Sequence, residues 1–334
     1  MEDLRIGIIG LGVGEKHIDG YMRHPKCQVT AICDLSEKRL SEVRGKYPDA
    51  KQTKYADELL EDPDIDVVSI ASYDNAHFSQ VCKALNHDKH VFVEKPLCLH
   101  EEEAITIRNL MNQKTHLKLS SNLILRRSPR FQHLKTIIDS GGLGELFYLE
   151  GDYNYGRIEK ITNGWRGDME FYSVIYGGGV HVADLLLWLA GELIEEVSAF
   201  GNNISSKGSK FRYNDMVVSI LKFKSGLIGK IAANFGCVFP HFHQLTVYGT
   251  RGTFVNGMKE AFLYKSRDPL TQPQMLDSAY PGVHKGELIM SFIDSILHGT
   301  VPDVSTDDVF NAMSVCFAVE KAVKNNSVIP VRYI

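Results

Sequence analysis

Leu4-Arg-Ile-Gly-Ile-Ile-Gly-Leu-Gly-Val-Gly-Glu-Lys-His17 is the stretch that decides the fold of the first part of this chain. Its apolar beginning predicts a buried parallel strand, and the glycines that follow allow the backbone to turn tightly against a pyrophosphate. The next helix would direct its N-terminus at that negative charge. We therefore expect a dinucleotide-binding site, with nucleotide contacts from Gly10, Leu11, Gly12 and Val13.

An acid follows at the position where such a site holds the adenosine ribose. The apolar run Val29–Cys33 ends on Asp34, which lies 34 − 12 = 22 positions after Gly12. The usual offset is roughly 20 residues. A carboxylate accepts hydrogen bonds from ribose hydroxyls and repels a 2′-phosphate. The sequence therefore predicts NAD as the cofactor, and Asp34 disfavours NADP.

The glycine pattern departs from the usual one in one place. The third position after Gly12 is Glu15, where Gly or Ala is usual, and Gly14 comes one residue early. We interpret the turn as one residue shorter, with Gly14 allowing close helix packing. The alternative is that Glu15 caps the helix start.

The composition favours a two-domain enzyme without a nucleic-acid partner. The chain has 334 residues, of which 44% are hydrophobic and 23% charged, with a net charge of −4. Six cysteines lack CxxC pairing, which indicates reduced thiols and no disulfide framework. No His-x-x-x-His pair lies in a polar helix pattern, and His241-Phe-His243 lacks an evident third ligand, so we expect no metal. We expect neither a signal peptide nor a membrane span, and a cytoplasmic location.

Apolar runs alternate with helical patterns in the first part of the chain, which predicts a parallel sheet covered on both faces. The runs are Arg5 to Ile9, Val29 to Cys33, Val67 to Ala71 and His90 to Val93. Ligands bind beyond the carboxyl ends of such strands. Two polar segments follow these ends, Ser72 to His77 and Glu94-Lys95-Pro96.

Glu94-Lys95-Pro96 after a buried strand, with the glycine loop and the strand-turn-His77 element, resembles the Gfo/Idh/MocA family of nicotinamide-dependent oxidoreductases. Further matches follow in order along nearly the whole chain: Asn122, Arg126 to Phe131, Ile138 to Glu145, Trp165-Arg166, Gly177 to His181 with Asp184, and Tyr248 to Thr253. The resemblance implies an α/β protein with an N-terminal Rossmann domain, a doubly wound parallel sheet, over residues 1–121. It also implies a C-terminal α+β domain over residues 122–334 with an open, mainly antiparallel sheet.

The pattern of the second domain agrees with that implication. Five strands are predicted, several of them alternating: Glu145 to Tyr155, Val197 to Ile204, Met216 to Phe223, Leu227 to Phe235 and Gln244 to Tyr248. Asp307 to Lys324 predicts an amphipathic closing helix. Since apolar sheet faces left uncovered by helices usually pair with another subunit, the resemblance suggests a homodimer or homotetramer through this sheet.

The resemblance implies hydride transfer between a secondary hydroxyl and the nicotinamide. Such a reaction needs a base near the hydroxyl and a positive charge that stabilises alkoxide character. We expect Lys95 and His181 to be the catalytic residues. The alternatives are a solvated loop lysine and a histidine bonded to the backbone at a helix start.

One catalytic position departs from the family pattern. Many relatives place an Asp four residues before this histidine, whereas this sequence has Gly177. A carboxylate contribution would then come from elsewhere, and Asp184, one helical turn after His181, is the candidate. Asp184 could equally only support His181.

The resemblance also assigns cofactor and substrate contacts. Besides the glycine loop and Asp34, the expected cofactor contacts are Ser72, Tyr73, His77, Glu94, Lys95 and Asn122. The alternatives are packing for His77, a pair with Lys95 for Glu94, and a cap of the domain crossover for Asn122. The expected substrate contacts are Arg126, Trp165, Arg166 and Asp184.

These predictions together favour an NAD-dependent dehydrogenase acting on a CH–OH group of a sugar, inositol, sugar acid or nucleotide sugar, since aromatic faces stack on sugar rings and arginines bind carboxylates or phosphates. Two alternatives stay open at this point. One is an NAD-retaining lyase, epimerase or hydrolase without net redox, and the other is a non-catalytic sugar sensor on the same scaffold. No nucleic-acid or membrane partner is expected.

Overall fold

A computed structural model describes residues 3–334 of the chain, which divides into two compact units. The first unit contains the residues up to Ile124 together with His284–Phe310 and Ile334, and the second contains Leu125–Val283 and Asn311–Tyr333. The domain boundary predicted at residue 122 stays a prediction, and residues 1 and 2 of the predicted first domain lie outside the described residues. By its contacts, the segment His284–Phe310 groups with the first unit.

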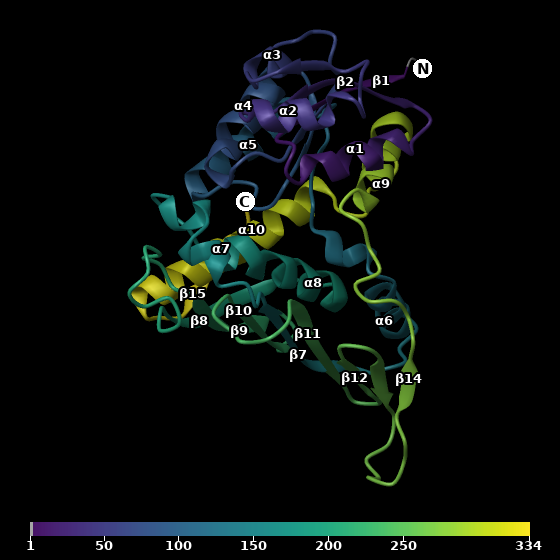
Figure 1. Ribbon diagram of the computed structural model, residues 1–334. Coiled ribbons are helices and arrows are strands. Elements are labelled where there is room, and N and C mark those ends of the chain that lie inside the picture. Colours follow the sequence, from purple (N-terminus) through teal and green to yellow (C-terminus); the bar gives the residue numbers. More distant parts are fainter. Residues whose placement is uncertain (1–2) are drawn as a thin grey trace. The chain divides into compact units, whose positions relative to one another are not determined.

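A six-stranded parallel sheet forms the centre of the first unit (Figure 1). Its order is β3-β2-β1-β4-β5-β6, which is that of a doubly wound dinucleotide-binding fold. The strands are β1 Leu4–Ile9, β2 Cys27–Cys33, β3 Lys51–Thr53, β4 Val67–Ile70, β5 His90–Val93 and β6 Leu119–Ser121. The predicted parallel sheet is confirmed, with two short edge strands, β3 and β6, that the sequence analysis did not include.

Helices cover both faces of this sheet. Val67 and Val68 of β4 direct their side chains to opposite faces, yet both are fully buried. The helices of the unit are α1 Gly14–Met22, α2 Glu37–Arg44, α3 Asp57–Leu60, α4 His77–Asn86, α5 Glu101–Gln113 and α9 Glu287–His298, with the 3₁₀ turn η1 Asp74–Ala76. A second 3₁₀ turn, η2 Ile124–Arg127, crosses the division, and from Leu125 on its residues belong to the second unit.

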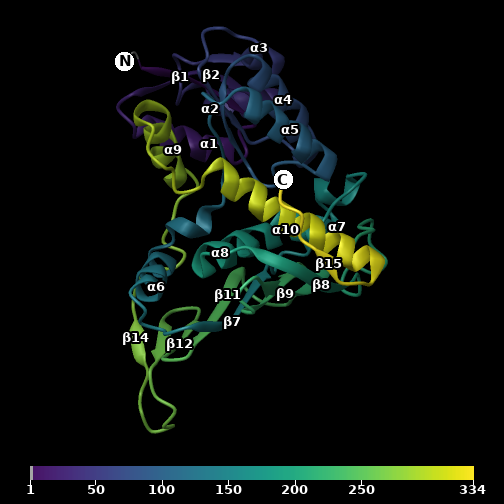
Figure 2. The same ribbon diagram turned by 180° about the vertical axis from the view of Figure 1, so that it is seen from behind.

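Helix α9 comes from far along the chain and lies beside α1 in both views of the molecule (Figures 1 and 2). The two backbones meet at glycines, since a Cβ on Gly20 would lie 2.7 Å from the carbonyl oxygen of Gly286. Only glycine permits this approach, and it makes α9 part of the first unit.

A nine-stranded sheet forms the second unit, in the order β14-β13-β12-β11-β7-β10-β9-β8-β15. The strands are β7 Leu146–Asn154, β8 Ile194–Asn202, β9 Met216–Phe223, β10 Ile228–Asn234, β11 Phe242–Gly249, β12 Thr253–Asn256, β13 Ala261–Tyr264, β14 Gln274–Leu276 and β15 Ile329–Pro330. Only the β7–β10 pair is parallel among the described strands of this sheet. The predicted open, mainly antiparallel sheet is therefore confirmed, and all five predicted strands are present.

One face of this sheet packs against α8. Leu149, Gly151 and Tyr153 of β7 are buried on this face, and a Cβ on Gly151 would lie 2.3 Å from Val182 Cγ1 of α8. The helices are α6 Pro129–Asp139, α7 Glu159–Thr162, α8 Val180–Ala190 and α10 Thr306–Asn325, with the 3₁₀ turn η3 Trp165–Asp168 and the π-helical turn η4 Ile175–Gly179. Helix α10 confirms the predicted closing helix, and the division between the two units falls inside it.

Candidate active site

The loop between β1 and α1 has the conformation that its glycines demand. Gly10 has a φ of +85°, and a Cβ there would lie 2.4 Å from the carbonyl oxygen of Ala71. Helix α1 begins at Gly14, where a Cβ would approach Ile8 Cγ2 to 3.0 Å. Gly14 thus permits the close packing of α1 on β1 that the sequence analysis assigned to it. Glu15 instead pairs with two basic residues, as described below.

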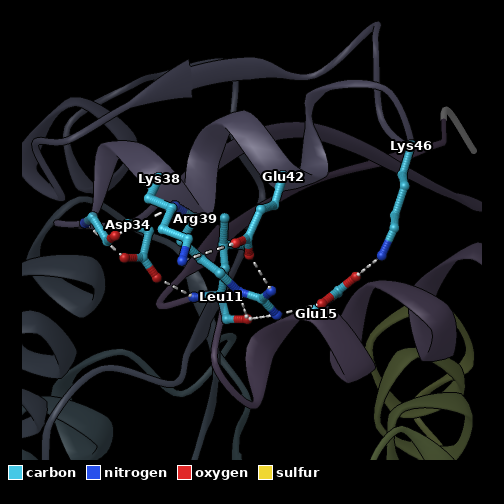
Figure 3. A network of polar contacts seen from close by, with 8 residues as sticks. Leu11, Glu15, Asp34, Lys38, Arg39, Glu42 and Lys46 are labelled. Atoms are coloured by element: carbon cyan, nitrogen blue, oxygen red, sulfur yellow. Dashed lines mark hydrogen bonds and ion pairs between the residues drawn. The ribbon is translucent and has the colours of Figure 1, made fainter.

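Asp34 holds this loop through the backbone. Its Oδ2 accepts a hydrogen bond from the Leu11 N–H at 2.7 Å, and its Oδ1 accepts one from the Ser36 N–H at 2.8 Å (Figure 3). The acid at the end of β2 and the residue between Gly10 and Gly12 are therefore directly connected.

The residues of this region fit a dinucleotide. A Cβ on Gly12 would meet no protein atom within 4 Å, so the packing of the chain itself does not require a glycine there. Open space at Gly12, the N-terminus of α1 and the Asp34 carboxylate are the three parts by which a doubly wound fold binds a pyrophosphate and a ribose.

The end of β4 carries Ser72, Tyr73 and His77. The Ser72 hydroxyl donates to Gln80 Oε1 at 2.7 Å, and the Tyr73 side chain is half exposed. His77 is fully buried, with Nδ1 2.7 Å from the carbonyl oxygen of Pro96 and Nε2 3.2 Å from that of Ser72. Its ring therefore joins the segments that follow β4 and β5.

Glu94, at the end of β5, lies in a buried polar network. Its Oε1 accepts a hydrogen bond from Asn122 Nδ2 at 2.7 Å and lies 3.2 Å from His17 Nε2. On the other side of the ring, His17 Nδ1 lies 2.9 Å from the Ser69 hydroxyl. Burial raises the pKa of Glu94, but the hydrogen bond with His17 and the positive charges of Lys285 and Lys95 outweigh it, so the pKa lies well below its ordinary value. Glu94 is therefore a carboxylate.

Lys95 follows this anchored carboxylate directly, and the peptide bond between Lys95 and Pro96 is cis. Asn122, the residue directly after β6, fixes the same region, because its Nδ2 also donates to the carbonyl oxygen of Lys285 at 3.1 Å. The Oδ1 of Asn122 is buried without a hydrogen-bond partner within residues 3–334. This oxygen can therefore accept a hydrogen bond from a donor on a bound ligand.

His17 and Ser69 also belong to this network and were not predicted from the sequence. His17 ends the stretch that decides the fold, three positions after Gly14, which places both on the same face of α1. The sequence signal for His17 is a histidine on the side of α1 that faces the sheet, together with an acid, Glu94, directly after a buried strand of that sheet.

His181 lies near the start of α8, in a cluster of aromatic rings in the second unit. Its ring stacks on Tyr153 at a centroid distance of 6.1 Å and meets the ring of His243 edge-on at 6.3 Å. Tyr153 also stacks on Phe235 at 5.7 Å. His181 is 4% exposed, so the cluster fixes its orientation.

A tyrosine hydroxyl lies beside Gly177, the position at which the resemblance led us to expect a carboxylate. A Cβ on Gly177 would lie 2.1 Å from the hydroxyl oxygen of Tyr172. This oxygen accepts a hydrogen bond from Arg166 Nε at 3.1 Å, and the guanidinium of Arg166 lies 4.4 Å from the ring centre of Trp165. Trp165, Arg166 and Tyr172 thus form one connected group beside Gly177.

Asp184 forms an ion pair with Arg126. The two are buried, and the Arg126 guanidinium donates through Nη2 at 2.6 Å and through Nε at 3.0 and 3.1 Å to the carboxylate. The structure therefore joins two residues that the sequence analysis assigned separately to the substrate.

Two further expectations concern metals and membranes. No group of three or more His, Cys, Asp or Glu side chains in residues 3–334 has the arrangement of a metal site. Within the same residues, no helix is both long enough and apolar enough to cross a bilayer.

Two family models match the chain. The model of the oxidoreductase family with an NAD-binding Rossmann fold matches residues 4–122, and the model of the Gfo/Idh/MocA C-terminal domain matches residues 131–255. The chain belongs to the Gfo/Idh/MocA family. The resemblance inferred from the motifs is thereby confirmed, and this Gfo/Idh/MocA protein is an oxidoreductase.

Relatives of this Gfo/Idh/MocA protein match over most of its length. Myo-inositol 2-dehydrogenase of Thermotoga maritima is 26% identical over 333 residues, which cover 96% of each chain. Scyllo-inositol 2-dehydrogenase (NAD(+)) of Bacillus subtilis is 26% identical over 261 residues, which cover 76% of this chain and 74% of the relative. The solved structure of levoglucosan dehydrogenase in complex with NADH has a TM-score of 0.87 and 21% identity, with full coverage of both chains. At that identity, the structural likeness shows the fold.

Proposed function

We propose that this protein is an NAD-dependent dehydrogenase that acts on a secondary hydroxyl of a cyclic polyol or sugar. The observation that carries the proposal is the set of hydrogen bonds that hold Glu94, the residue directly after β5. Glu94 is hydrogen-bonded to His17 of the helix that follows the glycine loop, which ties Lys95 to the nucleotide-binding part of the fold. The named relatives, two inositol dehydrogenases and a levoglucosan dehydrogenase, support the substrate class.

In this proposal the catalytic groups are Lys95 and His181. NAD, when bound, supplies the acceptor for a hydride. The Lys95 ammonium stabilises the substrate oxygen as it loses its proton, and the His181 imidazole accepts that proton. Tyr172, whose oxygen accepts from Arg166, takes the place of the carboxylate that relatives carry at the position of Gly177.

The proposed cofactor contacts are those that the sequence suggested: Gly10, Leu11, Gly12, Val13, Asp34, Ser72, Tyr73, His77, Glu94, Lys95 and Asn122. The carboxylate of Asp34 receives the adenosine ribose and disfavours the 2′-phosphate of NADP. His77 contributes by holding the backbone carbonyl of Pro96 in place.

An uncharged substrate is the best match to the second unit. Arg126, which could have bound a carboxylate or phosphate, is neutralised by Asp184. Aromatic rings around His181 suit the apolar face of a sugar or inositol ring. We assign Trp165 and Arg166 to substrate contact, and Arg126 with Asp184 to a supporting pair. These observations favour a neutral polyol over a sugar acid or a nucleotide sugar.

We further propose a homodimer or homotetramer through the nine-stranded sheet, with the second domain beginning at residue 122. Phe200, Ile220 and Ile228 are about half to two-thirds exposed on three neighbouring strands, β8, β9 and β10. Such an apolar surface is typical of subunit interfaces. The six free thiols favour a cytoplasmic location.

The test is absorbance at about 340 nm with purified protein, NAD and a panel of inositols, neutral sugars, sugar acids and nucleotide sugars. Reduced cofactor that accumulates with inositols or neutral sugars supports the proposal. Product detected by mass without that absorbance would favour a retained-hydride lyase or epimerase. Ligand binding without any product would favour a sensor, and neither alternative has support among the relatives named above.

A further inference from the structure

Glu15 stands where the glycine pattern usually has Gly or Ala, and it binds two cations. Its Oε1 accepts from the Lys46 ammonium at 2.6 Å, and its Oε2 accepts from Arg39 Nη2 (Figure 3). The Glu15 side chain is 13% exposed, so water screens these pairs less than it would on an open surface. The hydrogen bond from Lys46 and the charge of Arg39 lower the pKa of Glu15.

The guanidinium of Arg39 donates hydrogen bonds to three residues. Its Nε and Nη2 donate to the carbonyl oxygen of Leu11 at 3.1 and 2.9 Å, and its Nη1 donates to Glu42 at 3.0 Å. The third is the hydrogen bond from Nη2 to Glu15. The guanidinium is thereby held in one orientation, against the glycine loop and the first turn of α1.

Arg39 also lies close to the residue that selects the ribose. Asp34 accepts from the N–H of Leu11, while Arg39 donates to the carbonyl of the same residue. In doubly wound folds that bind NADP, an arginine near the end of the second strand receives the 2′-phosphate. Arg39, five positions after Asp34, is such an arginine by location.

We propose that Glu15 is a specificity-determining residue, which keeps Arg39 from a 2′-phosphate and so acts with Asp34 to select NAD over NADP. This inference rests on the proposed function, because it concerns the same nucleotide site. It also accounts for an acid at a position that the glycine pattern normally fills with a small residue.

The experiment compares the dissociation constants of NADH and NADPH by fluorescence titration of the full chain. In Glu15→Gln, the amide keeps the size of the side chain and removes its charge. We expect the ratio of the NADPH constant to the NADH constant to fall at least about tenfold, because charge-assisted bonds from arginine become available to the phosphate. The ratio is measured within one protein sample, so partial unfolding does not alter it.

Two further variants identify the cause. Glu37→Gln removes one negative charge from the exposed start of α2, where Glu37 contacts Lys54 and not Arg39. It should change the ratio less than about threefold, since an exposed charge acts only weakly. In Glu15→Gln combined with Arg39→Gln, most of the gain in NADPH binding should disappear.

An unchanged ratio in Glu15→Gln, with NADH still bound, would overturn this inference and leave the proposed function intact. An equal fall of the ratio in Glu37→Gln would also overturn it, because net charge alone would then explain the effect. Failure of the unaltered protein to bind either nucleotide would overturn the inference together with the proposed function.

Discussion

The hydroxyl oxygen of Tyr172 lies 2.1 Å from the point that a Cβ on Gly177 would occupy. The Tyr172 hydroxyl can occupy this position only because residue 177 is a glycine. Tyr172 is 2% exposed and its oxygen is bonded to Arg166, so the ring cannot turn aside without losing that bond.

Gly177→Ala should destabilise the protein by about 1–3 kcal/mol, because a methyl group would overlap a buried hydroxyl. The midpoint of thermal unfolding, followed by circular dichroism, should fall by roughly 1–4 °C. Gly45→Ala is the control, since Gly45 has a φ of −71° and open space around its Cβ. An equal fall in both variants would contradict the overlap.

Tyr172→Phe should lower kcat by about tenfold to a hundredfold, since in the proposed site it removes the hydroxyl that takes the place of a carboxylate at position 177. The dissociation constant of NADH should stay the same. Tyr248→Phe, on the half-exposed outer side of β11, provides a matched loss of a hydroxyl with no expected effect. Unchanged kcat in Tyr172→Phe would remove Tyr172 from the proposed site.

Lys95→Ala should lower kcat at least about a hundredfold, since it removes the charge that we propose stabilises the substrate oxygen. NADH should still bind within about threefold of the unaltered protein. Lys16→Ala, which removes an exposed lysine of α1, should leave both quantities unchanged. Equal turnover in the two variants would rule out a catalytic Lys95.

Glu94→Gln should show a stability loss that depends on pH. The pKa of Glu94 in the folded protein lies well below its ordinary 4.5, so the carboxylate contributes stability that is fully present above pH 4.5 and is lost as the pH falls through the folded value. The difference in unfolding midpoint between the variant and the unaltered protein should therefore be larger at pH 7 than at pH 4. A difference that stays constant between these pH values would show that the charge of Glu94 is not what stabilises the network.

Local patterns were sufficient for most of the fold. Apolar runs and glycines predicted β1, β2, β4 and β5, because a buried parallel strand and a tight turn each leave a signal within a few residues. The three-residue strands β3 and β6 lie at the two edges of the sheet, where pairing on one side alone imposes little on the sequence.

The partners of the site residues were harder to predict, since they depend on contacts between distant positions. Arg126 and Asp184 were both selected from the sequence, but they are 58 positions apart and nothing in between indicates that they pair. Glu94 and His17 are 77 positions apart. Tyr172 fills the space beside Gly177 through the path of the loop before η4, which no helical or strand periodicity describes.

The contact of α9 with α1 at Gly20 and Gly286 has a consequence for biosynthesis. Domains generally fold as units while the ribosome is still extending the chain. The nucleotide-binding unit of this protein cannot do so in one early step, because α9 is made after the whole nine-stranded sheet except β15. Until residue 298 leaves the ribosome, the face of α1 that contains Gly20 lacks its contact with α9. We therefore expect chaperones to bind the incomplete nucleotide-binding unit.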